Sequence, residues 1–155
     1  MSPKKTKTSK KASKARPERD LALEAQDVLD TFGAAVRSDR DYPALHLAPP
    51  VGRLNDPNGL YVEDGVLHAY YQHDPQWPIA EKRTGWGHAS TPLLSDKPEL
   101  WTHHPDALYP AVDYDDKGCY SGSAVLVNGE LELFYTCNAK PGGHRRATQR
   151  AQGFG

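Results

Sequence analysis

The sequence predicts an all-β domain that is preceded by a disordered basic tail and one amphipathic helix. Two observations lead to the β prediction. Thirteen glycines and thirteen prolines among 155 residues favour turns over long helices, and hydrophobic residues make up 37%, below the roughly 45–50% of typical globular chains. After Tyr42-Pro43 the apolar residues recur at every second position, the period of a strand with one buried face. The length allows one ordinary domain of roughly 100–200 residues.

The charges of the chain are divided between a basic tail and an acidic body. Residues 1–16 hold seven Lys or Arg and no Asp or Glu, which leaves 12 basic and 20 acidic side chains and a net charge of −8 in the remainder. Residues 1–19 have no apolar periodicity, so we expect a disordered tail. An acidic body is a poor partner for nucleic acid, and only the tail could contact phosphates. We therefore expect no nucleic-acid partner.

Neither a membrane segment nor a disulfide framework is indicated. No stretch approaches the roughly 18 apolar residues that a membrane span needs, and no apolar segment of signal-peptide type follows the N-terminal lysines. Cys119 and Cys137 are the only cysteines, and their spacing matches no zinc site. We expect two reduced thiols in or near a β core, no membrane partner and a cytoplasmic location.

Residues 20–41 are predicted to form an amphipathic helix, over about 20–37, and a linker. Asp20 is a suitable N-cap. We expect the helix to pack against the domain that follows, residues 42–155, with binding of another protein as the alternative. The apolar residues at helical spacing are Leu21, Ala25, Val28, Leu29, Phe32 and Val36.

Two β-hairpins are predicted in the body of the chain. The first spans residues 60–72 with a turn at Glu63-Asp64-Gly65, and the second spans 123–136 with a turn at Asn128-Gly129. Asn-Gly is a strong hairpin signal because both residues tolerate positive φ. A shorter strand is predicted over 86–91.

Hairpins joined by long, irregular loops suit a propeller blade, a sandwich or a barrel. The pattern alone does not choose among these three. The chemistry of the loops is more informative than the strand pattern.

The string Arg53-Leu54-Asn55-Asp56-Pro57-Asn58-Gly59 stands immediately before the first hairpin. Asp-Pro and Asn-Gly are turn formers, and the string alone favours a plain turn. The alternative is a site in which Pro57 and Gly59 fix a backbone that directs the Asp56 carboxylate into a cavity, with Asn55 beside it as a hydrogen-bonding partner for a polar substrate.

Three further strings favour a site. They combine aromatic rings with amides and hydroxyls, which suits carbohydrates because a sugar offers C–H faces for stacking and hydroxyls for hydrogen bonds. The strings are Tyr70-Tyr71-Gln72, Trp86-Gly87-His88-Ala89 and Tyr120-Ser121-Gly122-Ser123-Ala124.

With these strings the sequence closely resembles glycoside hydrolase family 32, the invertase, sucrose-6-phosphate hydrolase and fructanase family. The family signature Trp-Met-Asn-Asp-Pro-Asn-Gly is present over residues 53–59 with its first two positions changed. The other three strings are similar to Phe-Tyr-Gln, Trp-Gly-His-Ala and Phe-Ser-Gly-Ser-Ala of the family, in the same order. The resemblance covers about residues 42–149. It implies the N-terminal part, about two blades, of a five-bladed β-propeller.

The resemblance also implies roles for individual residues. Asp56 is expected to be the nucleophile of a retaining hydrolysis of the terminal β-D-fructofuranosyl bond of sucrose or a related fructoside. The implied partner is a small carbohydrate, namely sucrose, sucrose 6-phosphate or a fructan, and the reaction needs no cofactor and no metal. The residues expected to bind the substrate are Leu54, Asn55, Gln72, Trp77, Tyr120 and Ser121.

A retaining glycosidase needs a second carboxyl group about 5–5.5 Å from the nucleophile. In the family this general acid is a Glu in a Glu-Cys string, and a further Asp lies in an Arg-Asp-Pro string. Neither string occurs in these 155 residues. The expectation is therefore an N-terminal fragment of an enzyme that is inactive by itself. The alternatives are a non-catalytic carbohydrate-binding remnant and an interaction protein that acts through its basic tail.

Two other chemistries are disfavoured. The chain has seven histidines, but none forms a two-ligand helical spacing with a third ligand nearby, so we expect no metal site. Ser121-Gly122-Ser123 is not the Gly-x-Ser-x-Gly string of an esterase. The histidines are His46, His68, His73, His88, His103, His104 and His144.

Overall fold

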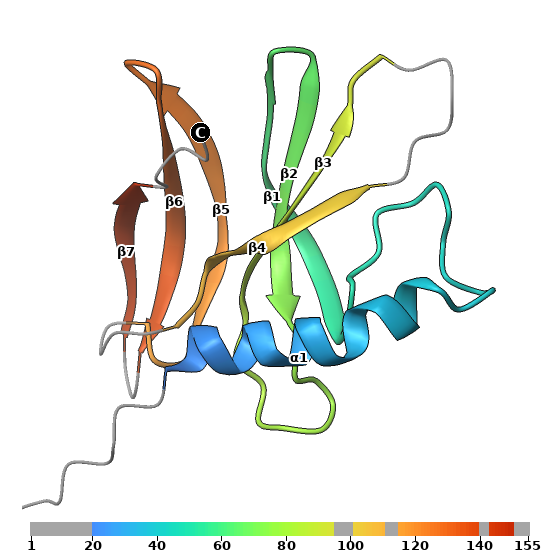
Figure 1. Ribbon diagram of the computed structural model, residues 1–155. Helices are drawn as coiled ribbons and strands as arrows, with labels where there is room; N and C mark the ends of the chain where they lie inside the picture. The colour runs from blue at the N-terminus through green and yellow to red at the C-terminus, as the bar shows by residue number, and fades with distance from the viewer. Residues whose placement is uncertain (1–19, 95–100, 111–114, 140–142, 151–155) are drawn as a thin grey trace, which may run out of the picture.

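The computed structural model describes residues 20–94, 101–110, 115–139 and 143–150, the last of these by their backbone only. The predicted disordered tail, residues 1–19, lies outside the described residues. One helix and seven strands are present, and the strands form two antiparallel sheets that stand side by side (Figure 1).

Sheet A has four strands and sheet B has three, each ordered as in the chain. Every neighbouring pair is antiparallel. A four-stranded meander of this kind is the blade of a β-propeller. Sheet A consists of β1 (Arg53–Glu63), β2 (Val66–Asp74), β3 (Gly85–Pro92) and β4 (Thr102–Leu108), and sheet B of β5 (Gly118–Val127), β6 (Glu130–Ala139) and β7 (Gly143–Arg150).

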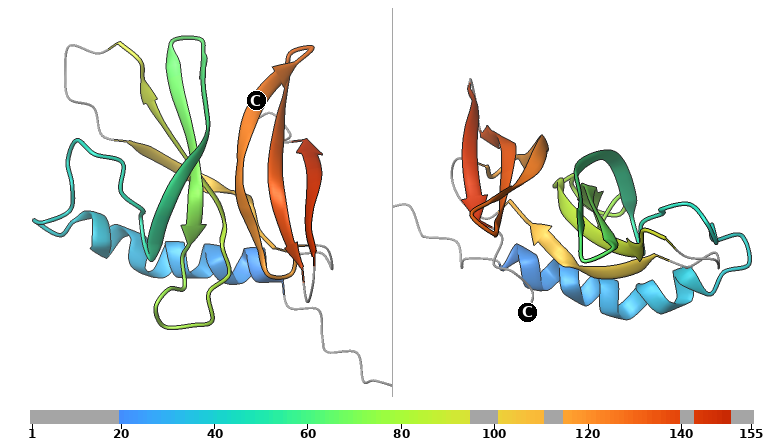
Figure 2. Two further views of the ribbon diagram at one scale, coloured as in Figure 1. Left: turned by 180° about the vertical axis from the view of Figure 1, so that it is seen from behind. Right: turned by 90° about the horizontal axis from the view of Figure 1, so that it is seen from above.

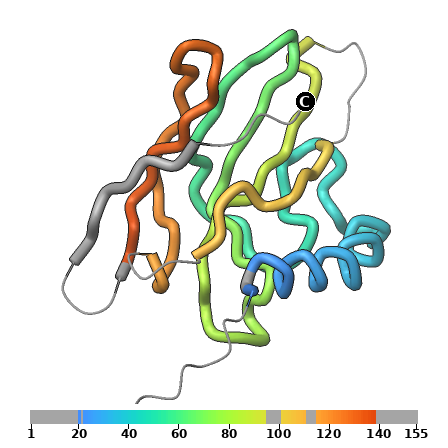
Figure 3. The backbone as a smooth tube through the Cα atoms, turned by 60° about the vertical axis from the view of Figure 1, so that its left-hand side comes forward, coloured from blue at the N-terminus to red at the C-terminus, as the bar shows by residue number. Residues whose placement is uncertain are grey.

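Both predicted hairpins are confirmed, and so is the strand predicted over residues 86–91. Asp64 and Gly65 close the first hairpin with φ of 48° and 78°, and Asn128 and Gly129 close the second with 53° and 81°. Two successive residues with positive φ match the right-handed twist of the flanking strands. The two hairpins run in the same direction along neighbouring sheets (Figure 3).

The prediction that residues 53–59 precede the first strand is wrong, because β1 already begins at Arg53. Its pairing with β2 shifts register twice, between Leu54 and Pro57 and between Pro57 and Leu60. Such bulges let a strand accommodate a proline and redirect its side chains. The string is therefore a bulged strand and not a turn.

Strands β4 and β7 were not predicted. Strand β4 has the sequence Thr-His-His-Pro-Asp-Ala-Leu, which contains a proline and lacks apolar alternation. It is the last strand of its sheet, the position at which a strand tolerates proline.

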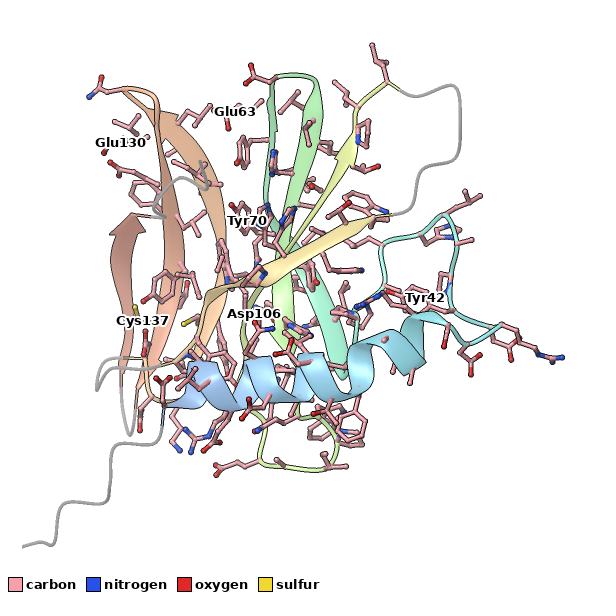
Figure 4. All side chains as sticks on the ribbon, in the orientation of Figure 1. Tyr42, Glu63, Tyr70, Asp106, Glu130 and Cys137 are labelled. Carbon is pink, nitrogen blue, oxygen red and sulfur yellow. The ribbon has the colours of Figure 1, made fainter. Side chains whose placement is uncertain are left out.

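The hydrophobic core lies between the two sheets, and Figure 4 labels two of its members, Tyr70 of sheet A and Cys137 of sheet B. Cys119 and Cys137 are buried thiols that are not joined in a disulfide, and they lie opposite each other on β5 and β6. The buried residues of the core are Tyr70, Trp86, Leu108, Cys119, Leu131, Leu133, Tyr135 and Cys137.

The predicted helix is confirmed as α1 (Leu21–Arg37), and the Asp20 carboxylate caps it by accepting from the Leu23 N–H at 3.2 Å. The helix runs alongside β4 (Figure 2). Its predicted apolar face is covered only in part. Ala25 is buried, but Phe32 and Val36 are 51% and 37% exposed, because the helix meets the edge strand of sheet A and not the whole sheet.

Candidate functional site

The site begins at the first bulge of β1. Asn55 and Asp56 lie there, both exposed, opposite the end of β2 that carries Gln72. Because the register is interrupted on both sides of Pro57, these side chains leave the regular alternation of the strand. Gln72 is 7% exposed and faces sheet B, since it alternates with the buried core residue Tyr70 on β2.

A bulge in sheet B places Ser121, the hydrogen-bonding partner of Asp56. The pairing of β5 with β6 shifts register between Tyr120 and Gly122, and Ser121 lies at the shift. Ser121 is exposed and reaches across to sheet A. The site is therefore built where two interrupted strands, β1 and β5, approach each other.

Three hydrogen bonds connect four side chains in series, and we call this group the relay. Its members are Asn55, Gln72, Ser121 and Asp56. The Asn55 amide nitrogen lies 3.2 Å from Gln72 Oε1, and Gln72 Nε2 donates to Ser121 Oγ at 2.9 Å. The Ser121 hydroxyl donates to Asp56 Oδ2 at 2.9 Å. Among the described residues none donates to the other carboxylate oxygen of Asp56, Oδ1. The relay thus holds one oxygen of Asp56 and leaves the other open.

Three residues that were not expected at the site, Trp86, Thr84 and Asp115, contact β5 and fix its position. The Trp86 indole N–H donates to the Tyr120 carbonyl at 3.2 Å, and the Cys119 N–H donates to the Thr84 carbonyl at 2.8 Å. Asp115, which is 2% exposed, accepts from the Tyr135 hydroxyl at 2.9 Å and from the Cys119 thiol at 3.7 Å. Trp86 was visible in the Trp-Gly-His-Ala string, whereas no spacing signal marked Asp115.

The remaining predicted substrate-binding residues are placed less closely together. Leu54 is half-buried opposite His73 on β2. Tyr120 is half-buried, and the Lys82 ammonium lies 5.9 Å from its ring centroid. Trp77 is 43% exposed in the loop between β2 and β3, and in the described part of the chain no hydrogen bond or ring contact joins it to the relay.

The histidines of sheet A form structural contacts. His88 stacks on His104 with ring centroids 4.3 Å apart, and its Nε2 lies 3.0 Å from Nδ1 of His68. Burial, followed by the neighbouring imidazoles of His104 and His68, lowers the pKa of His88 to about 3. Within the described residues no group of three or more His, Cys, Asp or Glu side chains is arranged to hold a metal ion.

On the other face of sheet A, His73 is buried and forms an ion pair with Asp106, whose place beside α1 is seen in Figure 4. Nδ1 of His73 lies 2.8 Å from Asp106 Oδ1, and Nε2 lies 3.0 Å from the Val51 carbonyl. Burial lowers the pKa of His73, but the hydrogen bond and charge of Asp106, with the Val51 carbonyl and the charge of Asp74, together outweigh it and raise the pKa overall. This pair ties β2 to β4.

The comparisons with known proteins bear on this geometry. Residues 46–153 match the sequence profile of the N-terminal domain of glycosyl hydrolases family 32. The chain belongs to glycosyl hydrolase family 32. A raffinose invertase of Escherichia coli is 45% identical over 117 residues, which are 72% of this chain and 22% of the relative. A sucrose-6-phosphate hydrolase of Escherichia coli is 47% identical over 103 residues, 64% of this chain and 20% of the relative.

Solved structures of family 32 proteins match as well. A β-fructofuranosidase from Bombyx mori aligns with a TM-score of 0.65 at 30% identity, over 85% of this chain and 27% of that protein. A sucrose-6-phosphate hydrolase from Lactobacillus gasseri aligns with a TM-score of 0.62 at 31% identity, over 81% of this chain and 25% of that protein. Sheets A and B are thus part of a family 32 β-propeller. The chain spans about a fifth of the length of the curated relatives.

Proposed function

We propose that this chain supplies the nucleophile and the fructosyl-binding groups of a hydrolase that cleaves the terminal β-D-fructofuranosyl bond of sucrose or a related fructoside. Asp56 attacks the anomeric carbon through Oδ1, and the alcohol leaves. Water then hydrolyses the fructosyl-enzyme ester. The proposal assigns the general acid that protonates the leaving oxygen to residues outside these 155, because the Glu-Cys string expected to carry it does not occur among them.

The observation that carries the proposal is the environment of Asp56. Its carboxylate is exposed, one oxygen accepts from Ser121 at 2.9 Å, and no described residue donates to the other oxygen. A nucleophile needs a free lone pair and a fixed orientation, and this arrangement provides both. The names of the relatives support the choice of substrate, since they are a raffinose invertase and sucrose-6-phosphate hydrolases.

Glucose release from sucrose by the protein that carries this chain tests the proposal. Asp56→Asn keeps the shape of the side chain and removes its charge, so we expect the rate to fall by at least about a thousandfold, the scale of removing a covalent nucleophile. Asp64→Asn is the matched control. Asp64 lies at the hairpin turn with φ of 48°, a value that Asn tolerates. The activity of the Asp64→Asn variant should therefore stay at the wild-type level.

A carbohydrate-binding protein without catalysis is the second candidate, because the amides and the hydroxyl of the relay suit a sugar in either case. Sucrose binding at equal affinity in wild type and Asp56→Asn, without glucose release from the wild type, would favour that candidate. Glucose release that survives in Asp56→Asn would contradict the proposed role of Asp56.

A further inference from the structure

The relay has only one consistent arrangement of its protons when Asp56 is ionised. The two oxygens Ser121 Oγ and Asp56 Oδ2 lie 2.9 Å apart, and a carboxylate has no proton to donate. The single hydroxyl proton of Ser121 must therefore point at Asp56. Ser121 then has only lone pairs left for its second partner, Gln72.

The same reasoning fixes both amides. Gln72 must present its NH₂ group to Ser121, at 2.9 Å, and so its carbonyl oxygen is turned toward Asn55. Asn55 must in turn present its NH₂ group to Gln72 Oε1, at 3.2 Å. The charge of Asp56 thus determines the orientation of the Asn55 amide through the three hydrogen bonds of the relay. Asn55 itself makes no described hydrogen bond to the Asp56 carboxylate.

We propose that Asn55 is a positioning residue for Asp56 and acts through Gln72 and Ser121, an inference that rests on the proposed role of Asp56 as nucleophile. By donating to Gln72 Oε1 it keeps the Gln72 NH₂ group directed at Ser121. Ser121 then keeps its proton on Asp56 Oδ2. This leaves Oδ1 as the oxygen that attacks.

Asn55→Asp breaks this order with the smallest change of shape. The new carboxylate has no N–H, so it does not donate to Gln72 Oε1. Gln72 rotates to donate its NH₂ group to residue 55 and presents Oε1 to Ser121. The Ser121 proton is then drawn toward Gln72, and Asp56 loses its hydrogen bond without any change in Ser121 itself.

A double-mutant cycle on sucrose hydrolysis separates this effect from other consequences of the new charge. In the protein that carries this chain, Ser121→Ala should lower kcat/KM by about ten- to a hundredfold, the range for a hydrogen bond to a charged group. Asn55→Asp should lower it by a similar factor. In the Asn55→Asp background, Ser121→Ala should cost no more than about twofold further, because the bond is already lost.

Asn55→Asp also adds a negative charge beside Asp56, and Asn55 is expected to touch the fructosyl unit. If either of these explained its whole effect, the Ser121→Ala factor would appear undiminished in the double variant. Multiplicative losses therefore overturn the proposal. Asn128→Asp, an amide-to-carboxylate change at the far turn of sheet B, is the control and should leave kcat/KM unchanged.

The side-chain amide signals of Gln72 in a ¹H–¹⁵N spectrum provide a readout that needs no turnover. They should shift in Asn55→Asp and in Ser121→Ala and stay in place in Asn128→Asp. Unchanged Gln72 signals in Asn55→Asp would overturn the proposal even if activity falls. If the wild type hydrolyses no fructoside, the proposed function fails and the catalytic role of Asn55 with it, whereas the Gln72 signals still decide whether the relay is ordered as described.

Discussion

The Ser121 hydroxyl joins the two sheets at the site, because it lies within hydrogen-bonding distance of Gln72 on β2 and of Asp56 on β1 while it belongs to β5. Its position depends on the backbone next to it. The Trp86 indole holds the Tyr120 carbonyl at 3.2 Å, one residue before Ser121, and its fully buried ring lies between Tyr70 and Tyr135. We infer that Trp86 positions Ser121 through the backbone.

Trp86→Phe tests this, since it keeps an aromatic ring and removes the N–H. The Tyr120 carbonyl then loses this hydrogen bond, and we expect a destabilisation of about 0.5–1.5 kcal/mol, the usual net contribution of one intramolecular hydrogen bond. We also expect kcat for sucrose to fall more than KM rises. Thermal melting and steady-state kinetics measure both. Trp101→Phe, a half-buried tryptophan away from the relay, is the control, and equal effects of the two variants would contradict the role of Trp86.

Among single residues, the resemblance to the family indicated side chains of the site but not how they are held. Asn55, Asp56, Gln72 and Ser121 were all expected at the site, and they form one connected group. The supporting contacts of Trp86 join positions 34 apart in the sequence, and no local spacing encodes such a pair. Trp77 was expected there as the nearest aromatic residue in the loop after Gln72, and no described contact places it with the others.

Among the elements, β1 and β5 come unusually close where the two sheets meet. A Cβ built on Gly59 would lie 2.4 Å from Ala124 Cβ and 2.9 Å from Ala124 N. The absence of a side chain at residue 59 is therefore required for this approach, which also brings Asp56 and Ser121 together. The glycine of the Asn-Asp-Pro-Asn-Gly string has a packing reason, independent of any turn.

Gly59→Ala should destabilise the protein by about 1–3 kcal/mol, the usual range for overpacking. The added methyl group meets the methyl group and backbone of Ala124, so the two strands must separate. Ala124→Gly removes one of the two clashing groups and should recover part of the loss when combined with Gly59→Ala. Chemical denaturation of the four proteins measures this coupling, and strictly additive effects would contradict a direct contact between residues 59 and 124.

The elements that the sequence predicted are those with local signals. The hairpins carry Asp-Gly and Asn-Gly turns, and α1 has an N-cap and helical periodicity. Strand β4 is stabilised by pairing with β3 and by the ion pair of Asp106 with His73, so its own residues give no strand pattern. The bulges of β1 were also hidden, because a proline within an apolar-poor string is typical of a loop.

For the molecule as a whole, three histidines of sheet A whose pKa values are lowered make stability depend on pH. The pKa of His88 is lowered to about 3 and that of His103 to about 4, in both cases chiefly by burial, and the pKa of His104 is lowered as well. The unfolded chain, with ordinary histidine pKa values of about 6.5, binds these protons more readily. The contribution of these three histidines to stability is therefore complete above about pH 6.5. It is lost as the pH falls toward their folded-state pKa values.

The buried His88 should contribute a slope of up to about 1.4 kcal/mol per pH unit to the free energy of unfolding below about pH 6.5. His88→Phe keeps a flat ring between Tyr70 and His104 and removes one titrating group. Urea denaturation at several pH values measures how steeply the free energy of unfolding changes with pH. Between about pH 4.5 and pH 6 we expect this slope to be smaller in His88→Phe, by the amount that corresponds to about one proton taken up on unfolding. An unchanged slope in His88→Phe would contradict the assignment.

The two sheets also expose apolar side chains on their outer faces. Phe134 is 39% exposed between the buried Leu133 and Tyr135, so it points away from the core, and Val125 is 43% exposed on the same sheet. On sheet A, Leu60 and Val62 are 57% and 46% exposed. In a propeller each blade packs against its neighbours, and uncovered faces favour association.

We therefore expect the 155-residue chain alone to elute from a size-exclusion column as associated species and to melt over a broad temperature range. Phe134→Lys should reduce the association, because it places a charge at the centre of the outer face of sheet B. Leu94→Lys changes a 92% exposed leucine away from that face and should have little effect. A monomeric wild-type chain with a sharp cooperative melt would contradict the expectation and would strengthen the binding-protein alternative.

Identification of the carboxylate that carries the fructosyl group tests the role of Asp56 as nucleophile. β-D-Fructofuranosyl fluoride is a suitable reagent because its leaving group needs no general acid. After rapid acid quenching and peptide mapping by mass spectrometry, we expect the peptide that contains Asp56 to gain the mass of one fructosyl unit. The Asp56→Asn variant should show no such gain. Label on another carboxylate, or fluoride release at the wild-type rate by Asp56→Asn, would contradict this role.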